Sequence, residues 1–183
     1  PFDFPVGTII SKTFYYPVDA GARDGKVVLR ADATPAEYAG QGLALERVRL
    51  VETRLLVRRK AGWVAFPYVW NAQQTDAELA RAGDELPLTL LDAGGKQTDF
   101  TYVVPNANQC AGCHAPDNKS ERIAPIGLKA RHINREHRYP EGIENQLAHL
   151  SAIGYLRDAP APAHAPRNAD WHGAFSRSKS LSV

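Results

Sequence analysis

Apolar and polar residues alternate along much of the first hundred residues, a pattern typical of β-strands with one buried face. The alternation predicts strands at residues 8–16, 43–59, 63–70, 86–91 and 97–104. We expect a bulge near Leu55 and Leu56, where the alternation of the longest strand slips. Pro67 lies inside the strand 63–70, and because proline donates no ladder hydrogen bond, this strand is expected at an edge or a bulge.

Connections and helices are predicted from turn residues and from helical periodicity. Residues 60–62 and 93–96 are expected to be hairpin turns, and residues 18–39 an irregular excursion with a possible helical turn at 35–38. Residues 71–82 have helical character, with Thr75 as a cap candidate and Gly83 at the end. Later, residues 128–135 form a short basic helical stretch, and residues 143–153 form an amphipathic helix ended by Gly154.

Cys110, Cys113 and His114 form a C-x-x-C-H pattern, and these two cysteines are the only ones in the chain. The spacing is typical of c-type haem attachment, because two thiols one short turn apart can add to the two vinyl groups of one porphyrin. His114 would then be the proximal ligand of the iron. A zinc site would need a second Cys or His pair, and a thioredoxin-like redox pair would need a βαβ setting. We predict one covalent haem c per chain, with His114 as the metal ligand.

The elements and the motif together predict an α+β fold, with a mainly antiparallel β-sheet followed by a haem-bearing helix and a C-terminal helical cap. We expect one haem c domain over residues 1–156, with the sheet at 1–105 and the haem helix and cap at 106–156. Residues 157–183 are rich in Pro, Ala and Ser, which predicts an extended tail with Trp171 as an anchor candidate.

Composition narrows the function classes. The net charge of +2 is small, and no basic run is interleaved with aromatic residues, so we expect no nucleic-acid partner. No stretch is long and apolar enough to span a membrane. Haem c is normally attached outside the cytoplasm, so we expect a periplasmic or extracellular protein whose export signal is absent from this chain. The chain has no methionine, the commonest sixth ligand of electron-transfer cytochromes c.

Lys12 shares its predicted strand face with Ile10 and Phe14. Either this is the wetter face of the strand, or the lysine stem reaches along it to solvent. The arginines of the strand 43–59 are expected on a solvated face, with a haem propionate contact as the alternative for one of them. They are Arg47, Arg49, Arg54, Arg58 and Arg59.

The sixth coordination position of the iron is left open by the sequence, with no ligand, Lys12, His132 or His149 as the possibilities. His149 lies on the predicted amphipathic helix and His132 in the basic stretch, and either could instead be an ordinary surface or hydrogen-bonded imidazole. Arg131, with Lys129, is a candidate contact for the haem propionates, since carboxylates attract arginine. The alternative is a solvated basic patch that guides a partner.

Six segments resemble a bacterial family of secreted haem-c proteins of uncharacterised role. They are PVGTIISKTFYYP (5–17), ETRLLVRR (52–59), PYVWN (67–71), VPNANQC (104–110), PIGLKAR (125–131) and ENQL (144–147). The resemblance covers most of the chain up to about Leu156. Members of that family often carry a second haem-binding segment, so this chain is expected to be a short relative or a fragment of a longer protein.

A more distant resemblance rests on Gly7, Thr8 and Lys12 in the first strand, followed by an antiparallel sheet and C-x-x-C-H. This order is similar to the lysine-cross-linked hydroxylamine-oxidising cytochromes and to the beta-type cytochromes c-prime. The resemblance implies a five-coordinate iron, with Lys12 on the distal side or cross-linked to the porphyrin. This chain differs by continuing for residues 115–183, which bring further histidines.

Three functional hypotheses follow. We favour a monohaem cytochrome c that transfers electrons to or from another redox protein, with a histidine as the sixth ligand. The alternative is a haem enzyme or gas-binding protein with an open distal site that acts on hydroxylamine or nitric oxide. A third possibility is a haem-bearing module within a larger assembly.

Overall fold

The computed structural model describes residues 2–19, 25–30, 44–115 and 122–168. Its contacts divide the chain into a sheet unit, residues 4–124, and a C-terminal unit, residues 1–3 and 125–183. The possible helical turn at residues 35–38 and Trp171 lie outside the described residues, and the division at residues 156 and 157 stays a prediction.

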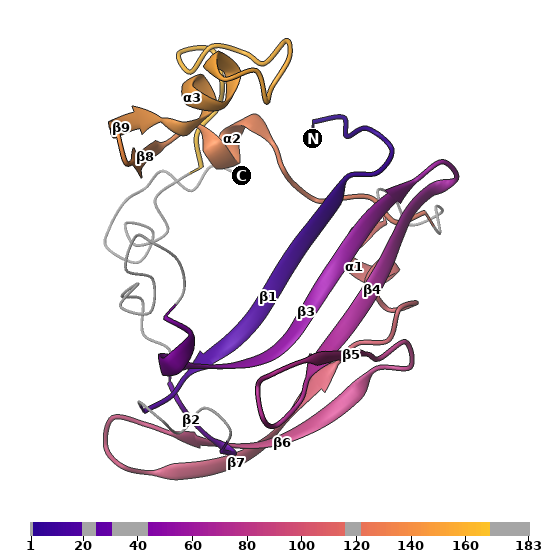
Figure 1. The fold of residues 1–183 in the computed structure, drawn as a ribbon, viewed down its shortest axis with the longest axis vertical. Helices are drawn as coiled ribbons and strands as arrows, with labels where there is room; N and C mark the ends of the chain where they lie inside the picture. Colours follow the sequence, from indigo (N-terminus) through magenta and orange to yellow (C-terminus); the bar gives the residue numbers. More distant parts are fainter. Residues whose placement is uncertain (1, 20–24, 31–43, 116–121, 169–183) are drawn as a thin grey trace. The chain divides into compact units, whose positions relative to one another are not determined.

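Four antiparallel strands form the first sheet of the sheet unit, in the order β1-β3-β4-β5 (Figure 1). They are β1 (Ile9–Pro17), β3 (Val48–Arg59), β4 (Gly62–Trp70) and β5 (Ala77–Leu79), and a short 3-10 helix, η1 (Leu45–Arg47), leads into β3. The strands β3 and β4 form the predicted hairpin around residues 60–62. β5 pairs only with residues 68–70 of β4.

Pro67 lies beside the end of β5 and does not disturb the pairing of β4 with β3. Its carbonyl oxygen accepts a hydrogen bond from the backbone N–H of Ala80, on the side away from β3. In an antiparallel strand the nitrogen of a residue points to the same side as its carbonyl, so the missing N–H costs no bond to β3. β4 lies between β3 and β5 in the sheet, so the expected edge position is wrong, although β5 is short and pairs only with residues 68–70.

The bulge lies at Val51 rather than near Leu55 and Leu56. The pairing of β1 with β3 shifts between Phe14 and Tyr15, which face Glu52 and Leu50, and Val51 is the extra residue. Pairing of β3 with β4 is unbroken from Glu52 to Arg59. The bulge directs Val51, which is 1% exposed, into the core.

The second sheet has the order β2-β6-β7, with β2 (Val27–Leu29), β6 (Asp84–Leu91) and β7 (Gln97–Val104). β6 and β7 form the predicted hairpin, whereas β2, expected to be irregular, pairs in parallel with β6. The two sheets meet in one core. It is built on Val18, Val28, Val51 and Leu88, with Phe14, Tyr16, Leu86, Leu90, Phe100 and Tyr102 packed around them.

The helix predicted at residues 71–82 is wrong. A turn is found there instead, followed by β5, and the buried side chain of Gln74 explains the difference. Its amide exchanges hydrogen bonds with the backbone of Leu50, accepting from the N–H at 2.6 Å and donating to the carbonyl at 3.1 Å. Gln74 also has a positive φ of 58°, which a helix does not tolerate.

The C-terminal unit contains α2 (Ala130–Ile133), a hairpin of β8 (Glu136–Tyr139) and β9 (Gly142–Asn145), and α3 (Gln146–Ala152). The helix predicted at residues 143–153 is found as α3, which begins three residues later than predicted, at Gln146. Asn145 explains the start, because its side chain accepts hydrogen bonds from the N–H groups of Leu147 and Ala148 and caps α3. The buried Asn134 donates to carbonyl groups of Pro162 and Ala165, which holds part of the predicted tail.

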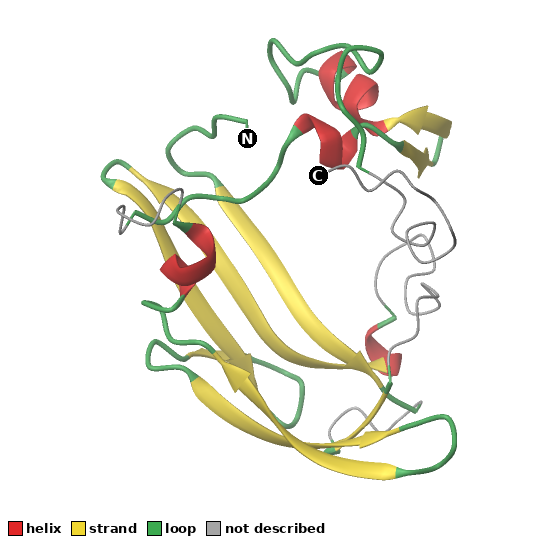
Figure 2. Ribbon diagram, turned by 180° about the vertical axis from the view of Figure 1, so that it is seen from behind, coloured by secondary structure: helices red, strands yellow, loops and turns green. Residues whose placement is uncertain are grey.

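Figure 2 shows that the described residues contain more strand than helix. One short helix, α1 (Cys110–His114), follows the last strand of the second sheet. Apart from the β2–β6 pair, every strand pairing in the described residues is antiparallel. The predicted class, α+β with a mainly antiparallel sheet, is confirmed.

Gly83 offers a test of how the sheet positions the chain before α1. It has φ +83°, and a Cβ there would lie 2.5 Å from the carbonyl oxygen of Val104 and 3.1 Å from the nitrogen of Asn106. We expect Gly83→Ala to lower the free energy of unfolding by on the order of 3 kcal/mol or more, because a backbone clash adds to the strain. The matched control Gly95→Ala, with φ +80° and open space around it, should cost about 1–2 kcal/mol. Equal losses in urea titrations of the two variants would contradict the close approach.

Candidate functional site

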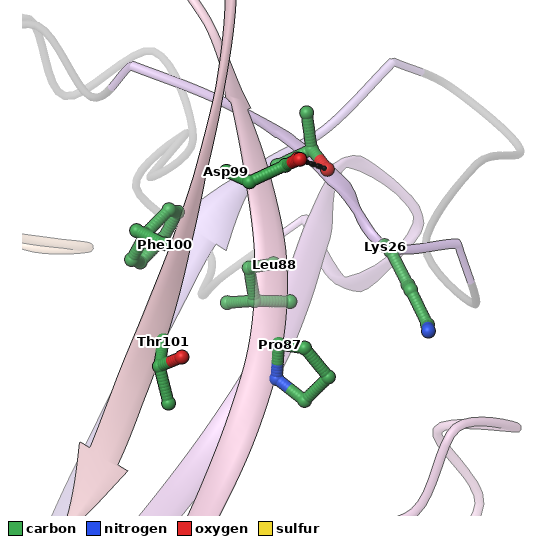
Figure 3. Close-up of a pocket in the computed structure, with 7 residues that line it drawn as sticks. Lys26, Pro87, Leu88, Asp99, Phe100 and Thr101 are labelled. Atoms are coloured by element: carbon green, nitrogen blue, oxygen red, sulfur yellow. Dashed lines mark hydrogen bonds between the residues drawn. The ribbon is translucent and has the colours of Figure 1, made fainter.

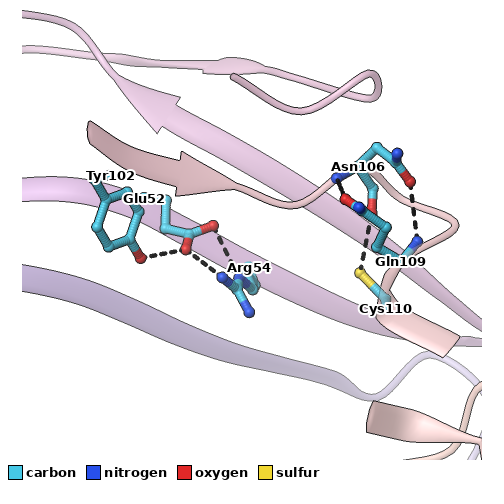
Figure 4. Close-up of polar contacts among 6 residues, drawn as sticks. All are labelled: Glu52, Arg54, Tyr102, Asn106, Gln109 and Cys110. Carbon is cyan, nitrogen blue, oxygen red and sulfur yellow. Dashed lines mark hydrogen bonds and ion pairs between the residues drawn. The ribbon is translucent and has the colours of Figure 1, made fainter. Parts of the chain in front are cut away.

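The segment before α1 is fixed by a reciprocal pair of side-chain hydrogen bonds. The Asn106 side chain accepts from the N–H groups of Asn108 and Gln109, both at 3.0 Å. The Gln109 side chain in turn accepts from the N–H of Asn106 at 2.9 Å (Figure 4). The pair resembles a capping box but lies in the turn before α1, whose N-cap residue Gln109 makes no side-chain cap hydrogen bond. It places Cys110 at a defined point after the sheet.

Cys110 and Cys113 are free thiols on α1, the first half-buried and the second exposed. Burial raises the pKa of the Cys110 thiol, with the nearby charges of Arg54 and Glu52 as further influences, Arg54 lowering it and Glu52 raising it.

His114 ends α1 with a defined ring orientation. Its Nδ1 lies 3.1 Å from the carbonyl oxygen of Ala124. A carbonyl only accepts, so Nδ1 carries the proton and Nε2 keeps its lone pair. A histidine that binds a metal through Nε2 is usually held in this way. The donor set of two free thiols and one oriented imidazole therefore fits a covalently attached haem, which supplies four further nitrogen ligands itself.

A buried carboxylate lies on the face of the first sheet that packs against the second sheet, called here the inner face. Glu52 has no exposed surface. It accepts a hydrogen bond from the Tyr102 hydroxyl at 2.5 Å and two from Arg54, through Nε at 2.9 Å and Nη2 at 2.5 Å. Figure 4 shows Arg54 on the side of Glu52 toward Cys110. Three donors thus compensate one buried charge.

Lys12 lies on this inner face, directly opposite Arg54 in the pairing of β1 with β3. Its Nζ is 4.6 Å from the centre of the Phe14 ring, and the guanidinium carbon of Arg54 is 4.5 Å from the same centre. The interpretation of this face as the wetter one is wrong, since its positions in β3 and β4 include buried side chains. They are Glu52, Leu56, Ala65, Pro67 and Val69.

The arginines of the predicted strand 43–59 were expected on a solvated face, and for two of them this is wrong. Arg49 is buried, 7% exposed, and its Nη1 donates to the carbonyl of Gly25. Arg54 is half-buried beside Glu52. Arg47 and Arg59 are exposed, as expected.

His149 and His132, both in the C-terminal unit, differ in which ring nitrogen carries the proton. Nδ1 of His149 lies 2.8 Å from a carboxylate oxygen of Glu144, so Nδ1 carries a proton, and in the neutral ring Nε2 has the lone pair. The His149 ring stacks on Tyr139 with centres 3.8 Å apart. Nδ1 of His132 instead accepts a hydrogen bond from the N–H of Lys129 at 3.3 Å, and burial lowers its pKa. In the neutral ring of His132 the proton is therefore on Nε2, and this tautomer has no free lone pair on Nε2 for a metal.

Arg131 is exposed on α2, in the C-terminal unit, and its propionate contact stays a prediction. Within the described residues, no group of three or more His, Cys, Asp and Glu side chains could hold a metal ion. None of the described helices is long and apolar enough to cross a membrane.

A cavity of about 470 Å³ lies on the second sheet, away from the motif (Figure 3). Its lining includes the aliphatic stem of Lys26, Pro87 and Thr101, and the Thr89 hydroxyl donates to the Asp99 carboxylate there at 2.6 Å. It contains none of the residues predicted to bind a cofactor. We assign it no role.

Searches of protein-family models, of curated proteins and of solved structures find no match to this chain.

Glu52 and Tyr102 were not identified from the sequence. The available signal was the pair Glu52 and Arg54, two residues apart in a strand of Leu and Val, which strand geometry places on one face. Tyr102 gave no such signal, because its strand pairs with β6 and reaches Glu52 only when the two sheets pack.

The Tyr102 hydroxyl gives a pH-dependent test of the network. Burial first, and then the hydrogen bond to Glu52, raises the pKa of Tyr102 above its ordinary value of 10.0. We expect Tyr102→Phe to lower the free energy of unfolding by about 1–3 kcal/mol at neutral pH. The advantage of the wild type should be complete below about pH 10 and shrink above it, because the unfolded tyrosine then ionises while the folded one keeps its proton. Urea titrations across this range measure both effects.

The matched control is Tyr155→Phe, since Tyr155 is 79% exposed. This variant should be as stable as the wild type at every pH. If the two variants behaved alike, the hydrogen bond to Glu52 would not contribute to folding.

Proposed function

We propose that this protein is a monohaem c-type cytochrome, with haem attached through Cys110 and Cys113 and His114 as the axial ligand. The observation that carries the proposal is the hydrogen bond from Nδ1 of His114 to the Ala124 carbonyl, which leaves Nε2 for a metal. The sequence motif and the two free thiols agree with it. Such a haem supplies one-electron redox chemistry when bound.

Electron transfer with a partner redox protein, in the periplasm or outside the cell, is the role we propose. Cys113 is exposed, so one attachment point of the haem would lie at the surface, where a partner can approach. A histidine sixth ligand remains the prediction for this role. Between the two candidates, the protonation of the ring favours His149, whose Nε2 has a lone pair, over His132.

A second candidate function is a haem enzyme or gas-binding protein with an open distal site for hydroxylamine or nitric oxide. One observation favours it. Lys12 and Arg54 share the inner face, and the Arg54 charge acts on the thiol of Cys110. Cationic donors beside a haem can hold or protonate a small ligand.

Covalent attachment is tested by expression in a bacterium that matures c-type haem. The wild type should gain the mass of one haem that survives acid extraction, because thioether bonds are not broken by it. The double variant Cys110→Ala, Cys113→Ala should lose the haem, and each single variant should keep one thioether with a shifted reduced absorption band. A wild-type chain without covalent haem would refute the proposal.

The two candidate roles are separated by the spectrum of the reduced protein with carbon monoxide. For electron transfer we expect a low-spin haem. Carbon monoxide should leave the spectra of the wild type and of His132→Ala unchanged, and it should bind to the haem of His149→Ala. A high-spin wild type that binds carbon monoxide, with a spectrum altered by Lys12→Ala, would instead support the open site.

A further inference from the structure

Two positively charged side chains lie opposite each other on the inner face, and no carboxylate pairs with both of them. Lys12 and Arg54 are directly opposite residues of β1 and β3, and both lie within 4.6 Å of the centre of one ring, Phe14. Like charges opposite each other destabilise an antiparallel pair. The ring attracts each cation through its quadrupole but neutralises neither.

Glu52 cannot neutralise both cations. Its two carboxylate oxygens are occupied by Tyr102 and by Nε and Nη2 of Arg54. Within the described residues, no carboxylate forms an ion pair with Lys12. One positive charge therefore remains on this part of the inner face after the buried carboxylate has been matched.

Donors remain for a further anion. Arg54 uses Nε and one N–H of Nη2 for Glu52, so three N–H groups are left, two on Nη1 and one on Nη2. About a third of its side chain is exposed, 34%. Lys12 is exposed and adds three N–H donors. A planar anion with two oxygens suits such a pair, since it can accept from both groups at once.

We propose that Lys12 and Arg54 form an oxyanion-binding site on the inner face, for a carboxylate or a small inorganic oxyanion. The bound group is either a propionate of the attached haem, in which case the inference rests on the proposed function, or a free anion. The anion would relieve the repulsion between the two cations, and Glu52 would hold Arg54 in position for it.

The free-anion source is tested with acetate as the probe on the full-length, haem-loaded protein, against chloride at equal ionic strength. Thermal unfolding at increasing concentrations gives an apparent dissociation constant, because a ligand of the folded state raises Tm. Lys12→Gln should weaken acetate binding by about tenfold or more, the loss of a charged hydrogen bond. Lys12→Arg should retain it, and so should the control Lys60→Gln in the exposed turn after β3.

The propionate source is tested with 13C-labelled propionate carboxyls in the same haem-loaded variants. If a propionate occupies the site, acetate gives no added stability, and Lys12→Gln raises the pH midpoint of one carboxyl by about one pH unit or more, because a nearby cation lowers a carboxyl pKa. Lys60→Gln should leave the midpoint unchanged.

Either result supports the site and identifies its source. The inference is overturned if acetate and chloride act alike in the wild type and the propionate midpoints are the same in Lys12→Gln and Lys60→Gln. If no haem is attached at all, the proposed cytochrome function fails by itself, and the acetate comparison alone decides the anion site.

Discussion

The buried carboxylate of Glu52 is the constraint on which the arrangement of the sheet unit depends. A carboxylate without exposed surface is stable only when donors replace its water. Arg54 supplies two of them from the same strand, and Tyr102 supplies the third from the second sheet. The bond from Tyr102 therefore links β3 to β7 and fixes how the two sheets meet. The bulge at Val51, the residue before Glu52, lets an apolar side chain enter the core beside this polar cluster.

The same cluster connects the core to the cysteine motif. β7, which carries Tyr102, ends at Val104, and the chain then passes close to Gly83 before the Asn106 and Gln109 hydrogen bonds begin α1. A shift of β7 relative to β3 would move both Tyr102 and the start of α1. Packing of the two sheets and placement of Cys110 are thus consequences of one set of contacts.

Much of the fold could be predicted from the sequence, because strand alternation and hairpin turns are local signals. Both long hairpins followed from such signals. The errors have non-local causes. Residues 71–82 form a turn because Gln74 bonds to the backbone of Leu50, and β2 pairs in parallel with a strand some sixty residues later. For the site, the spacing predicted Cys110, Cys113 and His114 as haem-binding residues, which stays a prediction, whereas Tyr102 reaches Glu52 only through packing between sheets.

The two candidate functions assign different roles to the same charges. Glu52 matches one cation of the inner face, Arg54, and the positive charge of Lys12 remains on that face. In a closed, six-coordinate haem this charge would act through space and favour the reduced, less positive iron. In an open site it would act directly on a bound ligand. An anion between Lys12 and Arg54 would cancel the remaining charge in either case, so occupancy of that site would determine how strongly the sheet influences the iron.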